Sequence, residues 1–155
     1  MSSAVVDTPI GPLLLTGDGE ALTGLHFGAG EEDRPGDLAE AAAQLEAYFA
    51  GRLTVFDLPL RLGGTPFQQR VWDQLRHIPY GETWTYRQLA AATGNPRATR
   101  AVGMANNRNP VSIIVPCHRV IGAGGSLTGY GGGLERKSWL LGHERGVRAE
   151  RLGPA

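Results

Sequence analysis

The stretch TWTYRQLAAATGNPRATRAVGMANN, residues 83–107, decides how the second half of the chain folds. Thr83 or Thr85 can cap a first helix, because a threonine side chain accepts hydrogen bonds from free N–H groups at a helix start. Gly94 can end that helix, and the Asn-Pro pair after it can begin the next one. Two short helices joined through Gly-Asn-Pro predict a helix-turn-helix.

The charged residues around this stretch are all basic. Residues 83–134 contain five arginines and no Asp, Glu or Lys. Residues 1–63 carry ten acidic and three basic residues, a net charge of −7, and residues 64–155 carry five acidic and twelve basic residues, a net charge of +7. A basic surface attracts polyanions, although a small domain can also be unevenly charged by chance.

The first 63 residues have another pattern, that of a small sheet with one helix. Short apolar runs broken by Pro-Ile-Gly-Pro and Gly-Asp-Gly predict strands, and the second break predicts a hairpin turn. Residues 38–51 predict a helix, with one apolar face at helical spacing. That face is made of Leu38, Ala42, Leu45 and Phe49. Residues 53–62 predict one more strand, limited by Pro59.

The second part is predicted to be mainly helical, with its boundary at residues 60–64. Thr65 and Pro66 match a helix cap and first position, and the helix that follows places Phe67, Val71, Leu75 and Ile78 on one face. Residues 110–115 predict a buried strand or extended segment. Residues 122–133 hold seven glycines, and residues 134–146 predict an amphipathic helix. The chain is thus expected to be α/β, with domains 1–63 and 64–155.

The chain has one cysteine, Cys117. It can form neither an internal disulfide nor a multi-cysteine zinc site, and the histidines at 26, 77, 118 and 143 lack zinc-ligand spacing, so no metal or cofactor is expected. A free thiol suits a reducing cytoplasm. No apolar run approaches about 18 residues, and the start does not resemble a signal peptide. We therefore expect a cytoplasmic protein without membrane contact.

Cys117 and His118 form a candidate nucleophile and base. The thiolate is the reactive form of cysteine, and a nearby base increases its share. Neighbours in an extended segment point to opposite sides, so the proton would pass through a turn or a bridging water. A third group must orient the histidine, and Glu144 is one of two acids between residues 83 and 145. The alternative is an inert buried cysteine.

Several motifs together resemble the O6-alkylguanine-DNA alkyltransferases, which repair DNA by direct reversal. NPVSIIVPCHRVIGAGGSLTGYGGG, residues 109–133, is similar to their active-site segment. The resemblance extends through PFQQRVW, IPYGETWTYRQLA, GNPRATRAVG and WLLGHE, and covers residues 66–145. It implies a ribonuclease H-like, structural N-terminal domain and a C-terminal domain for DNA binding and alkyl transfer.

The resemblance also implies a role for each site residue. Cys117 would take the alkyl group, so that each molecule acts once, with His118 as base, Glu144 orienting it and Asn109 positioning the segment. Tyr86 would donate to guanine N3. The base would further contact Val120, Tyr130 and Gly131. The family often has serine at the position of Gly131. A glycine there keeps the backbone N–H but lacks the hydroxyl. Arg119 is expected to be structural, pairing a carboxylate or carbonyl.

For DNA, the resemblance implies minor-groove binding by the second helix of the helix-turn-helix. Arg100 would fill the gap left by a flipped base. The minor groove carries a degenerate code, so binding would depend little on sequence. The other expected contacts are Thr85, Arg87, Arg97, Thr99, Ala101, Gly103 and Arg108. The alternative for the small residues in this helix is ordinary packing.

The expected partner is double-stranded DNA containing O6-alkylguanine, with activity on O4-alkylthymine left open. A monomer is expected, with cooperative assembly on DNA left open. Three other functions compete with alkyl transfer. The first is an alkyltransferase-like module that binds the lesion, and proteins of that class lack the acceptor cysteine. The second is a thiol hydrolase or redox enzyme, which would turn over. The third is a regulator that senses alkylation.

Overall fold

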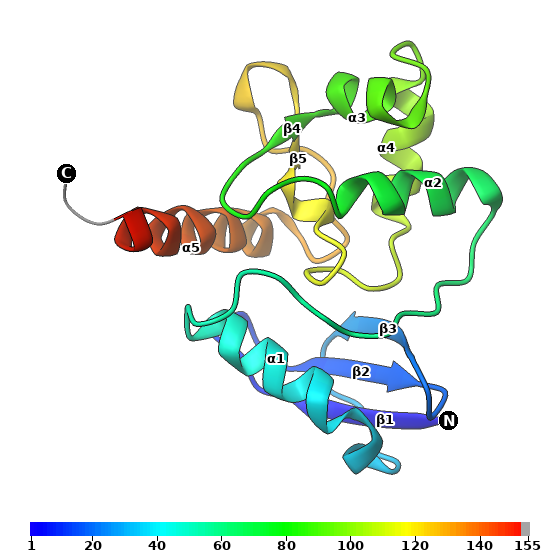
Figure 1. The fold of residues 1–155 in the computed structure, drawn as a ribbon, viewed down its shortest axis with the longest axis vertical. Helices are drawn as coiled ribbons and strands as arrows, with labels where there is room; N and C mark the ends of the chain where they lie inside the picture. The colour runs from blue at the N-terminus through cyan, green and yellow to red at the C-terminus, as the bar shows by residue number, and fades with distance from the viewer. Residues whose placement is uncertain (153–155) are drawn as a thin grey trace. The chain divides into compact units, whose positions relative to one another are not determined.

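The computed structural model describes residues 1–152, and the chain divides into two compact units, Met1–Gly63 and Gly64–Ala155 (Figure 1). The first is a sheet with one helix and the second is mainly helical, which confirms the predicted α/β class. No helix among the described residues is long and apolar enough to cross a membrane.

The N-terminal unit is built on a three-stranded antiparallel sheet in the order β1-β2-β3. The strands are β1 (Ser2–Val6), β2 (Leu13–Gly17) and β3 (Leu22–Phe27). Alternate residues of β1 and β2 are buried, as expected for a sheet with one covered face. Gly19 has a φ of 93° in the turn between β2 and β3, so the Gly-Asp-Gly prediction is confirmed.

A short 3₁₀ helix, η1 (Pro35–Leu38), leads into α1 (Ala39–Phe49), the cyan helix of Figure 1. Leu38 and Leu45 are buried as predicted. The rest of the predicted face is wrong, because Ala41 and Tyr48 are buried in place of Ala42 and Phe49. Ala41 and Tyr48 lie at helical spacing from Leu45, as Ala42 and Phe49 do, and each pair consists of an alanine and an aromatic residue. Only packing therefore decides which pair faces inward.

The strand predicted over residues 53–62 is absent. Leu60 makes a single parallel bridge with Leu22, where the N–H of Leu22 donates to Pro59 O at 2.9 Å and the N–H of Arg61 to Leu22 O at 2.9 Å. Pro59 has no N–H to donate, which limits the pairing of this segment with β3 to one residue.

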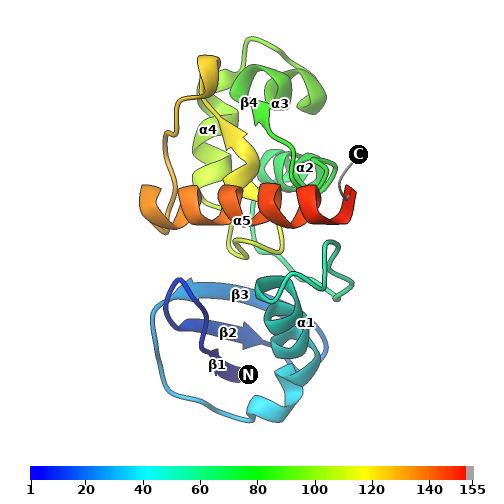
Figure 2. The same cartoon turned by 90° about the vertical axis from the view of Figure 1, so that its left-hand side faces the viewer.

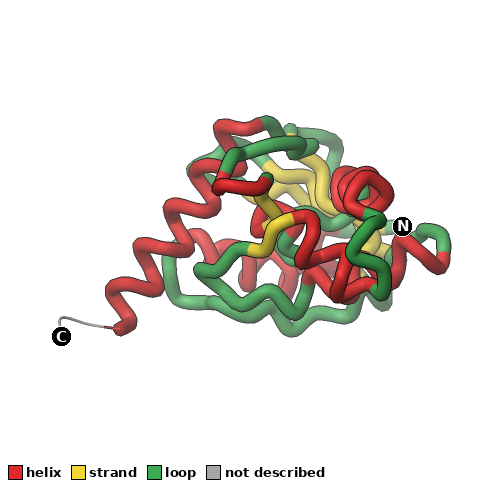
Figure 3. Tube along the Cα trace, turned by 90° about the horizontal axis from the view of Figure 1, so that it is seen from above, coloured by secondary structure: helices red, strands yellow, loops and turns green. Residues whose placement is uncertain are grey.

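The C-terminal unit packs α2 (Pro66–Leu75), α3 (Tyr86–Thr93) and α4 (Thr99–Asn107) together (Figure 2). Thr65 and Thr85 each form a capping box with the glutamine three residues later. Gly94 ends α3 with a φ of 120°. The predicted caps and the helix-turn-helix are therefore confirmed. The final helix, α5 (Leu134–Leu152), is the long red helix leading to the C-terminus in Figure 3.

Two details of these helices differ from prediction. In α2 the buried residues are Val71, Trp72 and Leu75, and Phe67 is only half-buried. α4 begins at Thr99 and not at the Asn-Pro pair. The Asn95 side chain accepts from the N–H of Arg97 at 3.0 Å, and such Asx turns compete with the first turn of a helix.

A short parallel pair connects α3 to the cysteine segment. β4 (Trp84–Thr85) pairs with β5 (Val120–Ile121), with Trp84 opposite Val120. Two further 3₁₀ helices are η2 (Cys117–Arg119) and η3 (Ala123–Gly125). The pairing places the start of α3 beside the residues that follow Cys117.

Candidate active site and nucleic-acid interface

The segment before Cys117 is a series of tight turns. The N–H of Ile114 donates to Ser112 O at 2.9 Å across Ile113, whose φ is 76°. This is a strained γ-turn, and a β-branched residue adopts it rarely. Residues 111–115 are buried as predicted, but the predicted strand is wrong, because the turn at Ile113 interrupts an extended backbone.

Asn109 holds both ends of this segment. Its Nδ2 donates to Val115 O at 2.7 Å, and its Oδ1 accepts from the N–H of Val111 at 3.0 Å. From α4, Asn106 Nδ2 donates to Cys117 O at 3.4 Å. The cysteine backbone is therefore fixed from two directions.

The Cys117 side chain is almost fully buried, and the residue is 4% exposed. Burial raises the pKa of the thiol, while hydrogen bonding with Asn109 and Ser112 and the charge of Lys137 act in the opposite direction. Its Sγ–H donates to Ser112 Oγ at 3.8 Å. The group is a protonated thiol at rest, so transfer chemistry requires a base.

His118 and Glu144 form a buried pair beside it. His118 Nε2 lies 2.7 Å from Glu144 Oε2. Burial lowers the pKa of His118, and Glu144 only partly opposes this. The neutral imidazole therefore donates through Nε2, because the carboxylate can only accept. Its Nδ1 has no hydrogen-bond partner among the described residues and carries the lone pair that can accept a proton.

Arg119 keeps Glu144 ionised. Its Nε and Nη2 donate to the two Glu144 oxygens at 2.8 and 3.0 Å, and its Nη1 donates to Ile78 O at 2.8 Å. Burial raises the pKa of Glu144, but His118 and Arg119 outweigh it and hold that pKa well below the usual range. Arg119 pairs a carboxylate and a carbonyl, as a structural residue would.

Lys137 joins the loop after Cys117 to α5. This residue is fully buried, and its Nζ donates to Val120 O at 2.5 Å and to Thr128 O at 2.8 Å. Tyr86 OH donates to the same Thr128 oxygen at 3.0 Å. Burial lowers the pKa of Lys137. The backbone of residues 122–133, the glycine-rich loop, is thereby held at Thr128 between α3 and α5.

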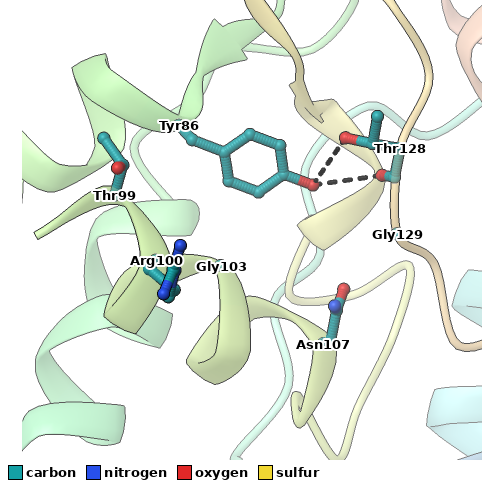
Figure 4. A pocket seen from close by; sticks show the side chains of 7 residues that line it. All are labelled: Tyr86, Thr99, Arg100, Gly103, Asn107, Thr128 and Gly129. Carbon is teal, nitrogen blue, oxygen red and sulfur yellow. Dashed lines mark hydrogen bonds between the residues drawn. The ribbon is translucent and has the colours of Figure 1, made fainter.

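An open cavity of about 500 Å³ lies next to this loop. Its lining comes from the start of α3, from α4 and from the loop: Tyr86, Thr99, Arg100, Gly103, Asn107, Thr128 and Gly129 (Figure 4). In Figure 4 the Tyr86 ring extends from α3 toward Thr128, with dashed lines to both of its oxygens. Cys117 does not line this cavity, so the structure separates the thiol from the space beside α4.

The two remaining predicted base contacts lie in the glycine-rich loop. Tyr130 is half-buried, and burial raises the pKa of its phenol well above the usual value. Gly131 is exposed, and a Cβ there would meet open space. Tyr130 also interacts electrostatically with Cys117.

The residues predicted to contact DNA form a mostly exposed surface on and beside α4, the α4 surface. Arg97, Arg100 and Arg108 are exposed, as are Thr99 and Ala101, and Gly103 is half-buried. Within residues 1–152 none of these arginines makes an ion pair. Arg87 on α3 is also exposed, and the Thr85 side chain is engaged in capping α3. The surface is cationic and open to solvent.

Three polar residues at the site were missed by sequence reasoning: Asn106, Ser112 and Lys137. Lys137 could have been singled out from the sequence, because it is the only lysine in a chain with fourteen arginines. Ser112 and Asn106 had none, because their contacts with Cys117 depend on the turn at Ile113 and on where α4 packs.

Comparisons with known proteins agree with this geometry. Residues 1–62 match the ribonuclease-like domain of 6-O-methylguanine DNA methyltransferase, and residues 66–146 match its DNA-binding domain. A methylated-DNA–protein-cysteine methyltransferase of Methanosarcina acetivorans is 53% identical over 150 residues, covering 91% of this chain and 96% of that protein.

Two crystal structures from Mycobacterium tuberculosis are also similar. An O6-methylguanine methyltransferase is 50% identical, with a TM-score of 0.89 and 99% of each chain covered. The protein OGT in complex with DNA is 54% identical, with a TM-score of 0.86 and 92% of each chain covered. With both domains matched along nearly all of its length, the chain belongs to the 6-O-methylguanine DNA methyltransferase family.

Proposed function

We propose that this chain repairs O6-alkylguanine in double-stranded DNA by moving the alkyl group, once and irreversibly, to Cys117. The observation that carries the proposal is a single buried thiol whose chain neighbour, His118, is buried, neutral and oriented by Glu144 at 2.7 Å. A nucleophile and an oriented base are the parts that alkyl transfer to sulfur needs. The family membership and a DNA-bound relative support the same function.

The transfer begins with loss of the thiol proton. His118 Nδ1 accepts it, directly or through a water molecule, and the ion pair with Glu144 stabilises the resulting imidazolium. The Cys117 thiolate then forms an S–C bond as the C–O6 bond breaks, and that electron pair stays with the guanine. Tyr86 supplies a proton at N3, so neutral guanine leaves, and the proton that His118 took from the thiol restores the Tyr86 phenol through solvent. A thioether has no good leaving group, and the protein is not regenerated.

The base is recognised by groups that Lys137 and Thr128 hold in place. The Val120 carbonyl accepts from Lys137 and has a second lone pair for the guanine amino group. Tyr86 OH is bonded to Thr128 O at rest, so binding of the base exchanges that hydrogen bond for one to N3. Tyr130 forms a wall of the pocket, and the Gly131 N–H faces O6.

DNA is held by α4 in the minor groove. Extruding a base costs a few kcal/mol, and Arg100 offsets this by filling the gap in the stack. Arg87, Arg97 and Arg108 contact phosphates, with Thr85, Thr99, Ala101 and Gly103 along the groove. The uncovered cations of this surface support such a role.

The two domains divide the work. Residues 64–155 contain both the thiol and the α4 surface, and residues 1–63 serve as a structural domain. The protein acts as a monomer in a reducing cytoplasm, where its single thiol stays reduced.

The test is the stoichiometry of repair. Protein is titrated against excess duplex carrying one O6-methylguanine, and restored guanine is quantified by chromatography. One guanine per protein is expected, reached in a single phase. Continued turnover would indicate a hydrolase instead, and tight binding to the lesion with no restored guanine would indicate a lesion-binding module.

A further inference from the structure

Ser112 is a side-chain hydrogen-bond partner of the Cys117 sulfur. Cys117 Sγ donates to Ser112 Oγ at 3.8 Å, and the two residues are 4% and 8% exposed. Among the described residues no hydrogen bond joins the sulfur to His118, whose Nε2 is bonded to Glu144 and whose Nδ1 has no partner.

The position of Ser112 is set by backbone turns and does not depend on a flexible side chain. Its carbonyl accepts the N–H of Ile114 across the strained turn at Ile113, and Val115 forms an isolated bridge with Ser112. Val115 O accepts in turn from the N–H of Cys117 at 2.8 Å. The turn that interrupts the predicted strand is what places the hydroxyl beside the sulfur.

A hydroxyl suits both protonation states of the sulfur. It accepts a hydrogen bond from the thiol, and after rotation about its C–O bond it donates one to the thiolate. A hydrogen bond to an anion is stronger than one between neutral groups, so this partner favours ionisation. Alanine or proline at the same place would offer the sulfur neither bond.

We propose that Ser112 is a catalytic residue, whose hydroxyl accepts from the Cys117 thiol at rest and donates to the thiolate that attacks the alkyl carbon. The step needs no further reactant, because the thiol proton goes to His118 and the serine keeps its own. As a role in alkyl transfer, this proposal rests on the proposed function.

The other groups near this sulfur are accounted for separately. Lys137 in α5 and Tyr130 in residues 122–133 interact electrostatically with Cys117, and His118 and Arg119 in η2 are paired with Glu144 in α5. Lys137 and Asn109 also favour the thiolate, and Ser112 adds to them. A substitution at Ser112 changes no formal charge, but Ser112 also interacts with the Tyr130 phenol, so Ser112→Thr, which keeps the hydroxyl, is the variant that isolates its effect.

The experiment titrates the thiol of the full chain without DNA. The rate of alkylation by iodoacetamide is measured against pH, and ultraviolet absorbance of the thiolate gives the midpoint independently of reagent access. The chain has one cysteine, so both signals come from Cys117. The variants are Ser112→Ala, Ser112→Thr, which keeps the hydroxyl, and Ser138→Ala, a control on the exposed side of α5.

We expect Ser112→Ala to raise the midpoint by about one pH unit, which is about tenfold less thiolate below the midpoint. Ser112→Thr and the control should stay near the unsubstituted protein, and transfer from an O6-methylguanine duplex should slow about tenfold in Ser112→Ala alone. An unchanged midpoint in folded Ser112→Ala overturns the proposal. If Ser112→Ala does not fold, Ser112→Gly is subject to the same test. If the chain transfers nothing from DNA, the proposed function fails, while the titration still decides whether Ser112 supports the thiolate.

Discussion

The cysteine site and the α4 surface hold their charges in opposite ways. At the site, His118, Arg119 and Glu144 are buried and joined by hydrogen bonds of 2.7 to 3.0 Å. On the surface, Arg100 and Arg108 are exposed and have no ion-pair partner within residues 1–152. A buried charge that loses its partner is costly, whereas a solvated arginine can be removed cheaply.

This contrast separates two functions within one small domain. Proton transfer needs a fixed, dehydrated set of groups, and attraction to DNA needs cations that are free to meet phosphates. Substitutions at the site should therefore change chemistry and stability together, and substitutions of the exposed arginines on α4 should change DNA binding or base flipping and leave stability and the chemical step unchanged.

The largest expected effect is that of Cys117→Ala. Transfer should be lost from both a methylated duplex and free O6-benzylguanine, because no other residue can replace the sulfur. The affinity for duplex, measured by fluorescence anisotropy, should stay within about threefold, because the α4 surface is intact. Residual transfer in this variant would refute the assignment of the acceptor.

Glu144→Gln should come next, because it removes the charge that orients His118 and pairs Arg119. Transfer in single-turnover kinetics should fall by about 10²-fold or more, the usual contribution of an oriented base. Chemical denaturation should show a loss of about 3 kcal/mol, because Arg119 stays buried without its partner. Glu135→Gln, on the exposed side of the same helix, is the control and should change neither value. Equal behaviour of the two variants would mean that the buried network has no catalytic role.

The same pair predicts how stability depends on pH. Glu144 and His118 both have lowered pKa values in the folded protein, so the unfolded chain binds protons more readily than the folded one. The His118 contribution is present above about pH 6.5, the ordinary pKa of histidine, and decreases as the pH falls below it, whereas the Glu144 contribution is present above about pH 4.5 and decreases only below that. Urea denaturation across this range should show a falling free energy of unfolding. The fall below about pH 4.5 should be smaller in Glu144→Gln, because glutamine does not titrate, and an equally steep fall there would contradict the role given to Glu144.

Arg100→Ala should have a smaller and selective effect. Repair of a duplex should slow by about tenfold, because the gap left by the flipped base is unfilled. Transfer from free O6-benzylguanine needs no flipping and should be unchanged. The ratio of the two rates is the measurement, and a parallel loss in both would place Arg100 in the chemistry and not on the DNA surface.

The smallest effect is expected for Arg108→Ala, at the end of α4. Affinity should weaken alike for damaged and undamaged duplex, and the slope of log K against log salt should fall by about one, the value for one phosphate contact. Transfer at saturating DNA should be unchanged. A salt slope identical to that of the unsubstituted chain would remove Arg108 from the interface.

Features that depend on residues close together in the chain, such as helix ends, could be predicted from the sequence. Thr65, Thr85 and Gly94 fix helix ends through their own side chains or backbone freedom, and the structure has those ends. The positions of Cys117 and His118 in the printed sequence were enough to suggest a nucleophile and a base, and the resemblance supplied most other site residues.

What the sequence could not predict depends on tertiary packing. The positive φ of Ile113 is unfavourable for a β-branched residue, so no local rule would place a turn there. Without that turn Ser112 cannot be placed at the sulfur. In the same way, the choice of Tyr48 over Phe49 in α1 is made by the sheet it packs on, and Pro59 limits a strand that the apolar pattern alone favours.

The most direct test of the central claim follows the carbon atom itself. A duplex whose O6-methylguanine carries a trideuterated methyl group is incubated with the protein, which is then digested and sequenced by tandem mass spectrometry. We predict that the label appears on Cys117, at one per molecule, with plain guanine left in the DNA. Label released as methanol, or found on any other residue, would contradict the account.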